Sequence, residues 1–206
     1  MGRRYLFCAS CRDYLVLVDS AQRCPRCFGS GRCVCSQFPP SMHRVATAFE
    51  GMGPARALIH AFREGGRPYL AKDIAAFMVQ QCMLLDFPFP DLLIPVPSSF
   101  VHATVRGYAP SILLAKEMGL LMKRPVKRLV AKQSGYFQQT KLTGEQRAEL
   151  PADLFVSRGR FSIEHLTVLL VDDLIGSYAT LRRVSWLVHE GRAQRIFGIG
   201  ASFDLI

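Results

Sequence analysis

The sequence has little that would suit a membrane protein, a repeat protein or a disordered one. It contains no uninterrupted apolar run of about 18 residues, so we expect no transmembrane helix. It shows no internal repeat and no low-complexity tract, which excludes solenoid architectures. Half of its 206 residues are apolar, which excludes a disordered chain and allows a sizeable buried core.

Acidic residues are also scarce relative to basic ones. The chain has 26 Lys and Arg against 16 Asp and Glu, a formal net charge of +10. Residues 1–45 carry seven Arg and two Asp and therefore hold half of that excess. This balance indicates a polyanionic partner, and it leaves nucleic acid, a phosphorylated ligand and an anionic membrane surface as candidates.

The basic N-terminal residues are followed by no apolar segment of the kind found in secretory signals. We therefore expect no cleaved signal and a cytoplasmic protein, whose thiols stay reduced. Six of the seven cysteines lie within residues 8–35, and the first four have the spacing C-x2-C-x12-C-x2-C. Two such knuckles complete a tetrahedral sulfur site, which is the preference of structural zinc. The predicted zinc ligands are Cys8, Cys11, Cys24 and Cys27.

Two further cysteines, Cys33 and Cys35, leave the register of this site open, because either could replace Cys27. A segment this short cannot bury a core of its own, so the metal is expected to fold it. Its arginine excess suits contact with nucleic acid, and a docking or scaffold role suits it equally.

Residues 36–43 contain two prolines and few periodic apolar positions, which predicts a boundary between two domains. We expect a cysteine-rich zinc-ribbon module with its linker over residues 1–43 and an α/β domain over residues 44–206. Short apolar strands alternate with helices in the second part, which predicts a mostly parallel sheet covered on both faces. The expected strands are 92–97, 126–130, 167–171 and 195–202, the expected helices are 54–64, 68–85, 109–121 and 179–190, and 133–150 is expected to be a loop.

The segment VLLVDDLIGSYATL, residues 168–181, is the strongest candidate for chemistry. Ligands of parallel sheets bind beyond the carboxyl ends of the strands, and here two acids and a hydroxyl-rich turn follow an apolar strand. Backbone N–H groups at the helix start, with the hydroxyls of Ser177 and Thr180, can hold a phosphate. Asp172 and Asp173 can accept ribose hydroxyls or order a Mg²⁺ ion that the ligand's phosphates mostly coordinate. The alternative is an acid pair that only caps the turn.

This segment resembles the PRPP (5-phosphoribosyl-1-diphosphate) signature of type I phosphoribosyltransferases, an apolar strand, two acids, two variable residues and T-T-G-A-T. The whole chain resembles the ComF family of competence-associated proteins. Four motifs occur in the family's order: the cysteine module, an L-I-x-x-F-K-like helix, a P-V-P strand followed by R-G, and a Q-x-x-L…R…F segment. The residues that carry the last three are Leu58, Ile59, Phe62 and Arg63; Pro95, Val96, Pro97, Arg106, Gly107 and Tyr108; and Gln139, Leu142, Arg147 and Phe155.

The resemblance implies a type I phosphoribosyltransferase-like fold and a displacement at the anomeric carbon of PRPP, assisted by Mg²⁺. Asp172 and Asp173 are then the catalytic candidates. The substrate-binding candidates are Gly176, Ser177, Tyr178, Ala179 and Thr180 for the 5-phosphate, with Arg106 and Gly107 facing the pyrophosphate. The family's role implies DNA uptake or DNA processing, with single-stranded DNA and a helicase or recombination protein as partners.

The chain departs from the family pattern at both ligand loops. Tyr178 stands where the signature has glycine, which predicts a clash with the 5-phosphate or a distorted loop, because glycine there allows positive φ or close approach. After Arg106-Gly107 the family's F-N-Q has become Tyr108-Ala109-Pro110, which removes two amide side chains and one N–H donor. These departures and the basic charge favour a ComF-like binding module. An active Mg²⁺-dependent phosphoribosyltransferase with an unknown acceptor is the alternative.

Overall fold

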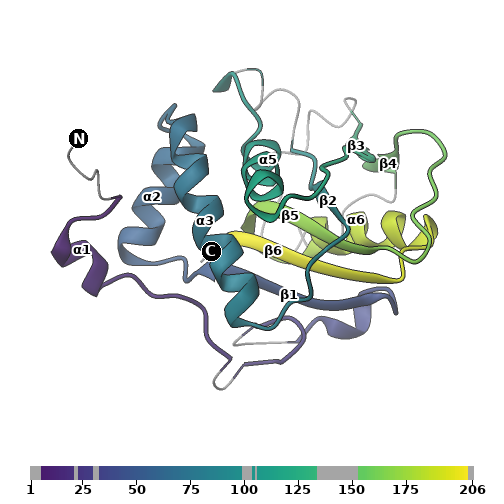
Figure 1. Cartoon of the computed structure of the whole chain (residues 1–206), viewed down its shortest axis with the longest axis horizontal. Helices are drawn as coiled ribbons and strands as arrows, with labels where there is room; N and C mark the ends of the chain where they lie inside the picture. Colours follow the sequence, from purple (N-terminus) through teal and green to yellow (C-terminus); the bar gives the residue numbers. More distant parts are fainter. Residues whose placement is uncertain are drawn as a thin grey trace.

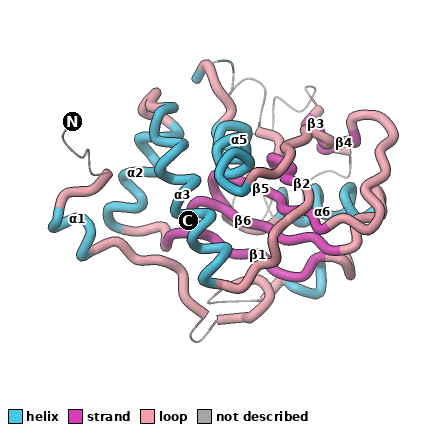
Figure 2. Tube along the Cα trace, in the orientation of Figure 1, coloured by secondary structure: helices cyan, strands magenta, loops and turns pink. Residues whose placement is uncertain are grey.

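The computed structural model describes residues 6–20, 23–29, 33–98, 104, 106–133 and 153–203. Its centre is a four-stranded sheet in the order β1-β6-β5-β2 (Figures 1 and 2), with every neighbouring pair parallel. The strands are β1 Met42–Phe49, β2 Leu92–Pro95, β5 Thr167–Ile175 and β6 Arg195–Phe203. All carboxyl ends therefore meet at one edge of the sheet. The predicted α/β class with a parallel sheet is confirmed.

Helices cover both faces of this sheet because the central strands are apolar on both sides. Leu169 and Val171 pack with residues of α2 Gly53–Arg63, α3 Ala71–Leu84 and α5 Pro110–Met122. The alternate residues Val168 and Leu170 pack on the other face, with residues of α6 Ala179–Glu190. Successive side chains of a strand point to opposite faces, which gives the two cores.

The remaining elements are small. A two-stranded antiparallel hairpin, β3 Val130–Lys132 and β4 Phe155–Ser157, stands beside the carboxyl end of β2. The short elements are α1 Ala9–Asp13 and the 3-10 turns η1 Cys35–Gln37 and η2 Pro68–Leu70. Most of the expected loop at 133–150 lies outside the described residues. No helix among the described residues is long and apolar enough to cross a membrane.

Two elements differ from expectation in a way that affects the site. β5 was expected to stop at Val171, but it continues to Ile175, so that Asp172 and Asp173 lie inside the strand. The pairing of Asp172 with Gly200 and of Leu174 with Ser202 on β6 extends the strand beyond its apolar run. β1 was not expected, because it begins inside the proline-rich segment 36–43, where a domain boundary was predicted.

The N-terminal segment packs against the same core as the sheet. Val18 and Phe28 are buried together with Phe49 of β1. Leu17 forms an antiparallel bridge with Phe49, and the Val45 N–H donates to the carbonyl of Arg26 at 2.7 Å. The cysteine-rich segment is therefore joined to the sheet by main-chain hydrogen bonds as well as by apolar contact.

Candidate functional site

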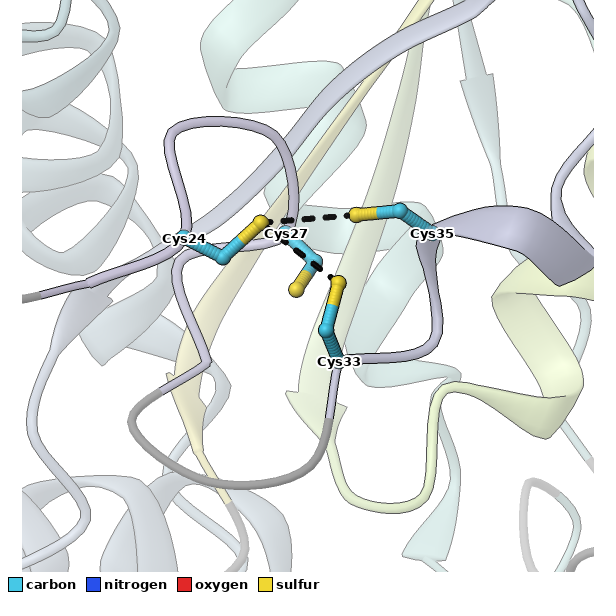
Figure 3. A group of neighbouring side chains, drawn as sticks. All are labelled: Cys24, Cys27, Cys33 and Cys35. Atoms are coloured by element: carbon cyan, nitrogen blue, oxygen red, sulfur yellow. Dashed lines mark hydrogen bonds between the residues drawn. The ribbon is translucent and has the colours of Figure 1, made fainter.

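One group of metal-ligating side chains lies together within the described part of the chain (Figure 3). It consists of Cys24, Cys27, Cys33 and Cys35, whose Sγ atoms all lie within 4.8 Å of one another. The Cys24 Sγ is 3.6 Å from that of Cys33 and 3.5 Å from that of Cys35, and all four are free thiols. Sulfurs about 2.3 Å from a tetrahedral zinc are roughly 3.8 Å apart, so the donor set fits such an ion.

This group differs from the predicted ligand set, which paired Cys24 and Cys27 with Cys8 and Cys11. Cys8 caps α1, where its Sγ accepts the N–H of Cys11 at 3.4 Å, and the preceding Phe7 ring packs on Phe77 of α3. Between the two C-x2-C pairs, Leu17 forms a bridge with Phe49 at the end of β1. Arg26, which lies within the second pair, is hydrogen-bonded to Val45, nearer the start of that strand. The sheet thus holds the first pair away from the second, and nearby Cys33 and Cys35 complete the group.

The cluster contains one thiol that is easily ionised. Burial by itself raises the pKa of Cys24, but backbone hydrogen bonds at Cys27 and Arg26 and thiol hydrogen bonds from Cys35 and Cys33 outweigh it and lower that pKa to about 6. Burial raises the pKa of Cys27 and of Cys35. A thiolate beside three thiols is a suitable starting point for metal binding, because thiolates are the ligands.

Two arginines of the cysteine-rich segment, Arg23 and Arg26, and Arg44 just after it bind the protein itself. Arg23 donates to the carbonyl of Phe28 at 2.8 Å and forms an ion pair with Glu50 at 2.6 Å. Arg26 donates to the carbonyls of Cys35, Pro39 and Met42. Arg44 donates to the carbonyl of Leu85 at 2.8 Å. These three cations support the fold of the segment, which weakens the case for a nucleic-acid surface formed by them.

The two predicted catalytic acids are both buried at the carboxyl end of β5. Asp172 is 8% exposed and Asp173 is 7% exposed, and the Asp173 N–H donates to Oδ1 of Asp172 at 2.9 Å. Burial raises the pKa of the Asp172 carboxyl well above its ordinary value, and the neighbouring Asp173 carboxylate raises it further. Two adjacent acids in this environment are a costly arrangement, which is common at functional sites.

Helix α2 delivers the counter-charges to this edge of the sheet. Its Arg63 Nε lies 2.6 Å from Oδ2 of Asp173, and the next residue, Glu64, forms an ion pair with Arg106 at 2.5 Å. The structure therefore links Arg106 to Asp173 through two consecutive residues of the helix end. The sequence did not predict the ion pair of Arg63 with Asp173. The available signal was the place of Arg63 in the L-I-x-x-F-R motif.

The predicted phosphate turn lies between β5 and α6 and borders a cavity of about 40 Å³. Asp172 and the turn residues line it together: Gly176, Ser177, Tyr178, Ala179 and Thr180. Tyr178 has a φ of 60°, the left-handed conformation that the glycine of the signature would adopt without strain. Gly107 also has a positive φ, of 78°.

The Tyr178 side chain reaches the cysteine cluster. Its ring packs edge-on against Phe38 and also contacts Phe203, and its hydroxyl donates to the carbonyl of Cys27 at 2.8 Å. Burial raises the pKa of this hydroxyl. The tyrosine thus joins the turn to the candidate metal ligands, a contact across 151 residues for which the local sequence gives no signal.

No family model matches the chain, and no curated protein matches it in sequence. The purine phosphoribosyltransferase from Pyrococcus horikoshii Ot3 is 13% identical with a TM-score of 0.43, over 64% of this chain and 70% of that one. The glutamic acid mutant from an analysis of an invariant aspartic acid in HPRTs is 13% identical with a TM-score of 0.38, over 69% and 79%. The corresponding asparagine mutant gives 13%, 0.37, 69% and 77%.

Proposed function

We propose that this chain is a phosphoribosyltransferase-like protein that binds a phosphorylated sugar of the PRPP type at the carboxyl edge of its sheet. The observation that carries the proposal is the pair of buried acids, Asp172 and Asp173, directly before the turn that opens α6. Ligands of parallel α/β sheets bind at this edge. The resemblance of the sequence to ComF proteins supports the same ligand.

Each group of the edge has a role within this proposal. The 5-phosphate lies on the N–H groups at the start of α6, with the hydroxyls of Ser177 and Thr180. The two acids accept the ribose hydroxyls; the Arg63 ion pair uses Oδ2 of Asp173, which leaves Oδ1 for the sugar. Carboxylate oxygens also suit Mg²⁺, which when bound with PRPP would neutralise the charge of the diphosphate. Arg106 and Gly107 face the pyrophosphate.

The cysteine cluster has a separate role in the proposal. Cys24, Cys27, Cys33 and Cys35 hold a structural zinc ion in this proposal, which the mutual proximity of their sulfurs, all within 4.8 Å, supports. The hydrogen bond from Tyr178 to the Cys27 carbonyl lets the zinc module support the phosphate turn. In this proposal, the module of residues 1–43 stabilises the phosphate turn of the domain formed by residues 44–206.

The resemblance extends the proposal to a cytoplasmic role in DNA uptake or DNA processing, with single-stranded DNA and a helicase or recombination protein as partners. The net charge of +10 favours a polyanionic partner. The Arg63–Asp173 ion pair favours binding without turnover, because it occupies one of the two acids. The alternative is an active transferase, in which an unknown acceptor displaces pyrophosphate from PRPP.

Calorimetric titration with PRPP and Mg²⁺ tests the proposal. Wild type should bind with a micromolar Kd, and Asp172→Asn/Asp173→Asn should weaken binding at least tenfold. Asp86→Asn/Asp153→Asn removes the same charge from two exposed positions and should bind like wild type. Absence of binding to folded wild type at millimolar PRPP would overturn the proposal. Release of pyrophosphate from PRPP with a candidate acceptor would favour the transferase alternative.

A further inference from the structure

A surface groove lies where α5 ends and the chain returns to the edge of the sheet. It measures about 540 Å³ and is lined by Lys116, Gly119, Leu120, Lys123, Arg124 and Val126. Val126 pairs with Leu93 of β2 in a parallel bridge, so one wall of this α5 groove is fixed to the sheet. The α5 groove shares no lining residue with the cavity at the Asp172 turn.

The shape of the α5 groove depends on Gly119. A Cβ atom at this position would lie 2.5 Å from Cγ2 of Val126 and 2.9 Å from the carbonyl oxygen of Arg124. Glycine therefore lets the segment after the helix approach it closely. The Arg124 N–H also donates to the Gly119 carbonyl at 2.9 Å. The floor of the groove is thus held by main-chain and close apolar contacts.

The helix that forms the groove is apolar on more faces than this chain covers. Lys116 and Glu117 are the two charged residues among the 13 of α5. Leu114 is fully buried in the core, whereas Leu120 is 73% exposed and Leu121 is 48% exposed. A single exposed leucine is ordinary on a protein surface, but Leu120 forms the wall of a concave site. A helix that is apolar all round is normally covered all round, so this face suits a partner.

The rim of the α5 groove is basic. Its lining includes three cations and, among the described residues, no acid. Residues 116–128 contain five Lys and Arg and one acid, Glu117. The ion pairs between described residues involve other cations, namely Arg23, Arg63, Arg106 and Arg192. An apolar floor beneath uncompensated cations is complementary to a surface that presents apolar side chains between carboxylates.

The apolar wall and the basic rim together select one kind of occupant. A second copy of this chain would bring together two molecules that each carry a net charge of +10 and repel one another. A nucleic acid would pair with the cations, but its phosphates offer no apolar contact to Leu120. An amphipathic helix with acidic residues beside its apolar stripe satisfies both features.

We propose that the α5 groove docks an acidic amphipathic helix of a partner protein. The apolar stripe of that helix packs on Leu120 and Val126, and its flanking carboxylates pair with Lys116, Lys123 and Arg124. This docking surface does not depend on the sugar-phosphate function, because the two sites have no lining residue in common.

Fluorescence anisotropy tests the groove with a synthetic peptide of about four helical turns, labelled with fluorescein, that carries leucine on one face and glutamate on the others. A companion peptide with glutamine in place of glutamate keeps the apolar face. Wild type should bind the acidic peptide at least tenfold more tightly than the companion. Leu120→Gln should weaken binding of the acidic peptide about tenfold, because burial of the leucine side chain is lost. Lys116→Gln/Arg124→Gln should weaken it at least fivefold.

The matched controls remove the same groups outside the groove. Leu84→Gln removes another exposed leucine, and Arg67→Gln/Lys72→Gln removes the same charge from exposed positions. Both variants should bind the acidic peptide like wild type. Asp172→Asn/Asp173→Asn should also bind it like wild type, so failure of the sugar-phosphate proposal leaves this result intact.

Two other occupants would be recognised in the same series of variants. Dimerisation in sedimentation that Leu120→Gln abolishes would assign the groove to a second copy of this chain. A single-stranded oligonucleotide whose affinity falls in the groove variants, while that of the peptide does not, would assign it to nucleic acid. Either result overturns the inference. It is also wrong if folded wild type does not bind the acidic peptide, or if all groove variants bind it as wild type does.

Discussion

Asp172 is an acid whose ionisation the fold opposes. Its carboxyl is buried beside a second acid, and the Arg63 guanidinium, which opposes the shift in pKa, forms its ion pair with Asp173. A polar group that is buried without full compensation costs stability. Under the proposed function, hydrogen bonding of Asp172 to the sugar phosphate at the adjacent turn offsets this cost.

Asp172→Asn should therefore stabilise the ligand-free protein, increasingly so as the pH rises. At pH values below 3.8, the ordinary pKa of this carboxyl, it is neutral in the folded and unfolded chains, so the substitution changes little. Above that pH the unfolded chain ionises freely and the folded one resists, so wild type loses stability until the raised folded-state pKa is passed. We expect the free energy of unfolding of the variant to exceed that of wild type by about 1–3 kcal/mol at pH 8.

Urea denaturation at a series of pH values measures this difference. Asp86→Asn, at an exposed position, is the control and should follow wild type at every pH. A variant of Asp172 that is less stable than wild type at pH 8 would show that the carboxylate is compensated in the fold.

At the scale of elements, the turn before α6 depends on what packs behind it. Tyr178 adopts a left-handed conformation that costs a non-glycine residue roughly 1 kcal/mol or more, and its hydrogen bond to Cys27 and its contacts with Phe38 and Phe203 offset that cost. The ring is directed to the cysteine-rich segment, so tyrosine at the glycine position is a connection between two elements.

The composition of the cysteine cluster predicts that substitution of its members changes the zinc content, whereas substitution of Cys8 or Cys11 does not. Cys24→Ser and Cys33→Ser should each lose zinc, while Cys8→Ser should keep a zinc-to-chain ratio near one, because its sulfur lies outside the cluster. Atomic absorption of the purified variants measures the ratio. Retention of zinc by Cys33→Ser together with its loss from Cys8→Ser would restore the set of Cys8, Cys11, Cys24 and Cys27.

At the scale of the whole molecule, the cysteine-rich segment that would hold the metal is expected to unfold together with the sheet. Val18 and Phe28 are buried in the core shared with β1, and Arg26 is bonded to the chain around that strand. A ligand that binds only the folded state stabilises the entire cooperative unit.

Removal of the metal with a chelator should therefore lower the thermal midpoint of the whole chain by at least about 5 °C, in a single transition. Differential scanning calorimetry with and without the chelator measures the shift. The Cys24→Ser variant, which already lacks the metal, should show no further change. Two separate transitions, or an unchanged midpoint in wild type, would contradict the expected coupling.

The amino-acid sequence by itself determined the features that depend on near neighbours. Local periodicity predicts the apolar strands at residues 92–97, 167–171 and 195–202 and the helices between them. The succession of a strand, two acids and a turn can be read directly along the chain. Asp172 and Asp173 could be proposed as candidate site residues for the same reason. Nothing local distinguished Cys8 from Cys33 as a candidate metal ligand, since both lie in short cysteine pairs.

The tertiary structure alone decided which distant groups meet. β1 keeps the first cysteine pair away from the second, Arg63 of α2 reaches Asp173, and Tyr178 reaches Cys27. Such contacts depend on how elements far apart in the chain pack, and there the free energy of burial outweighs the local conformational propensities of the residues. A local sequence pattern therefore does not predict them.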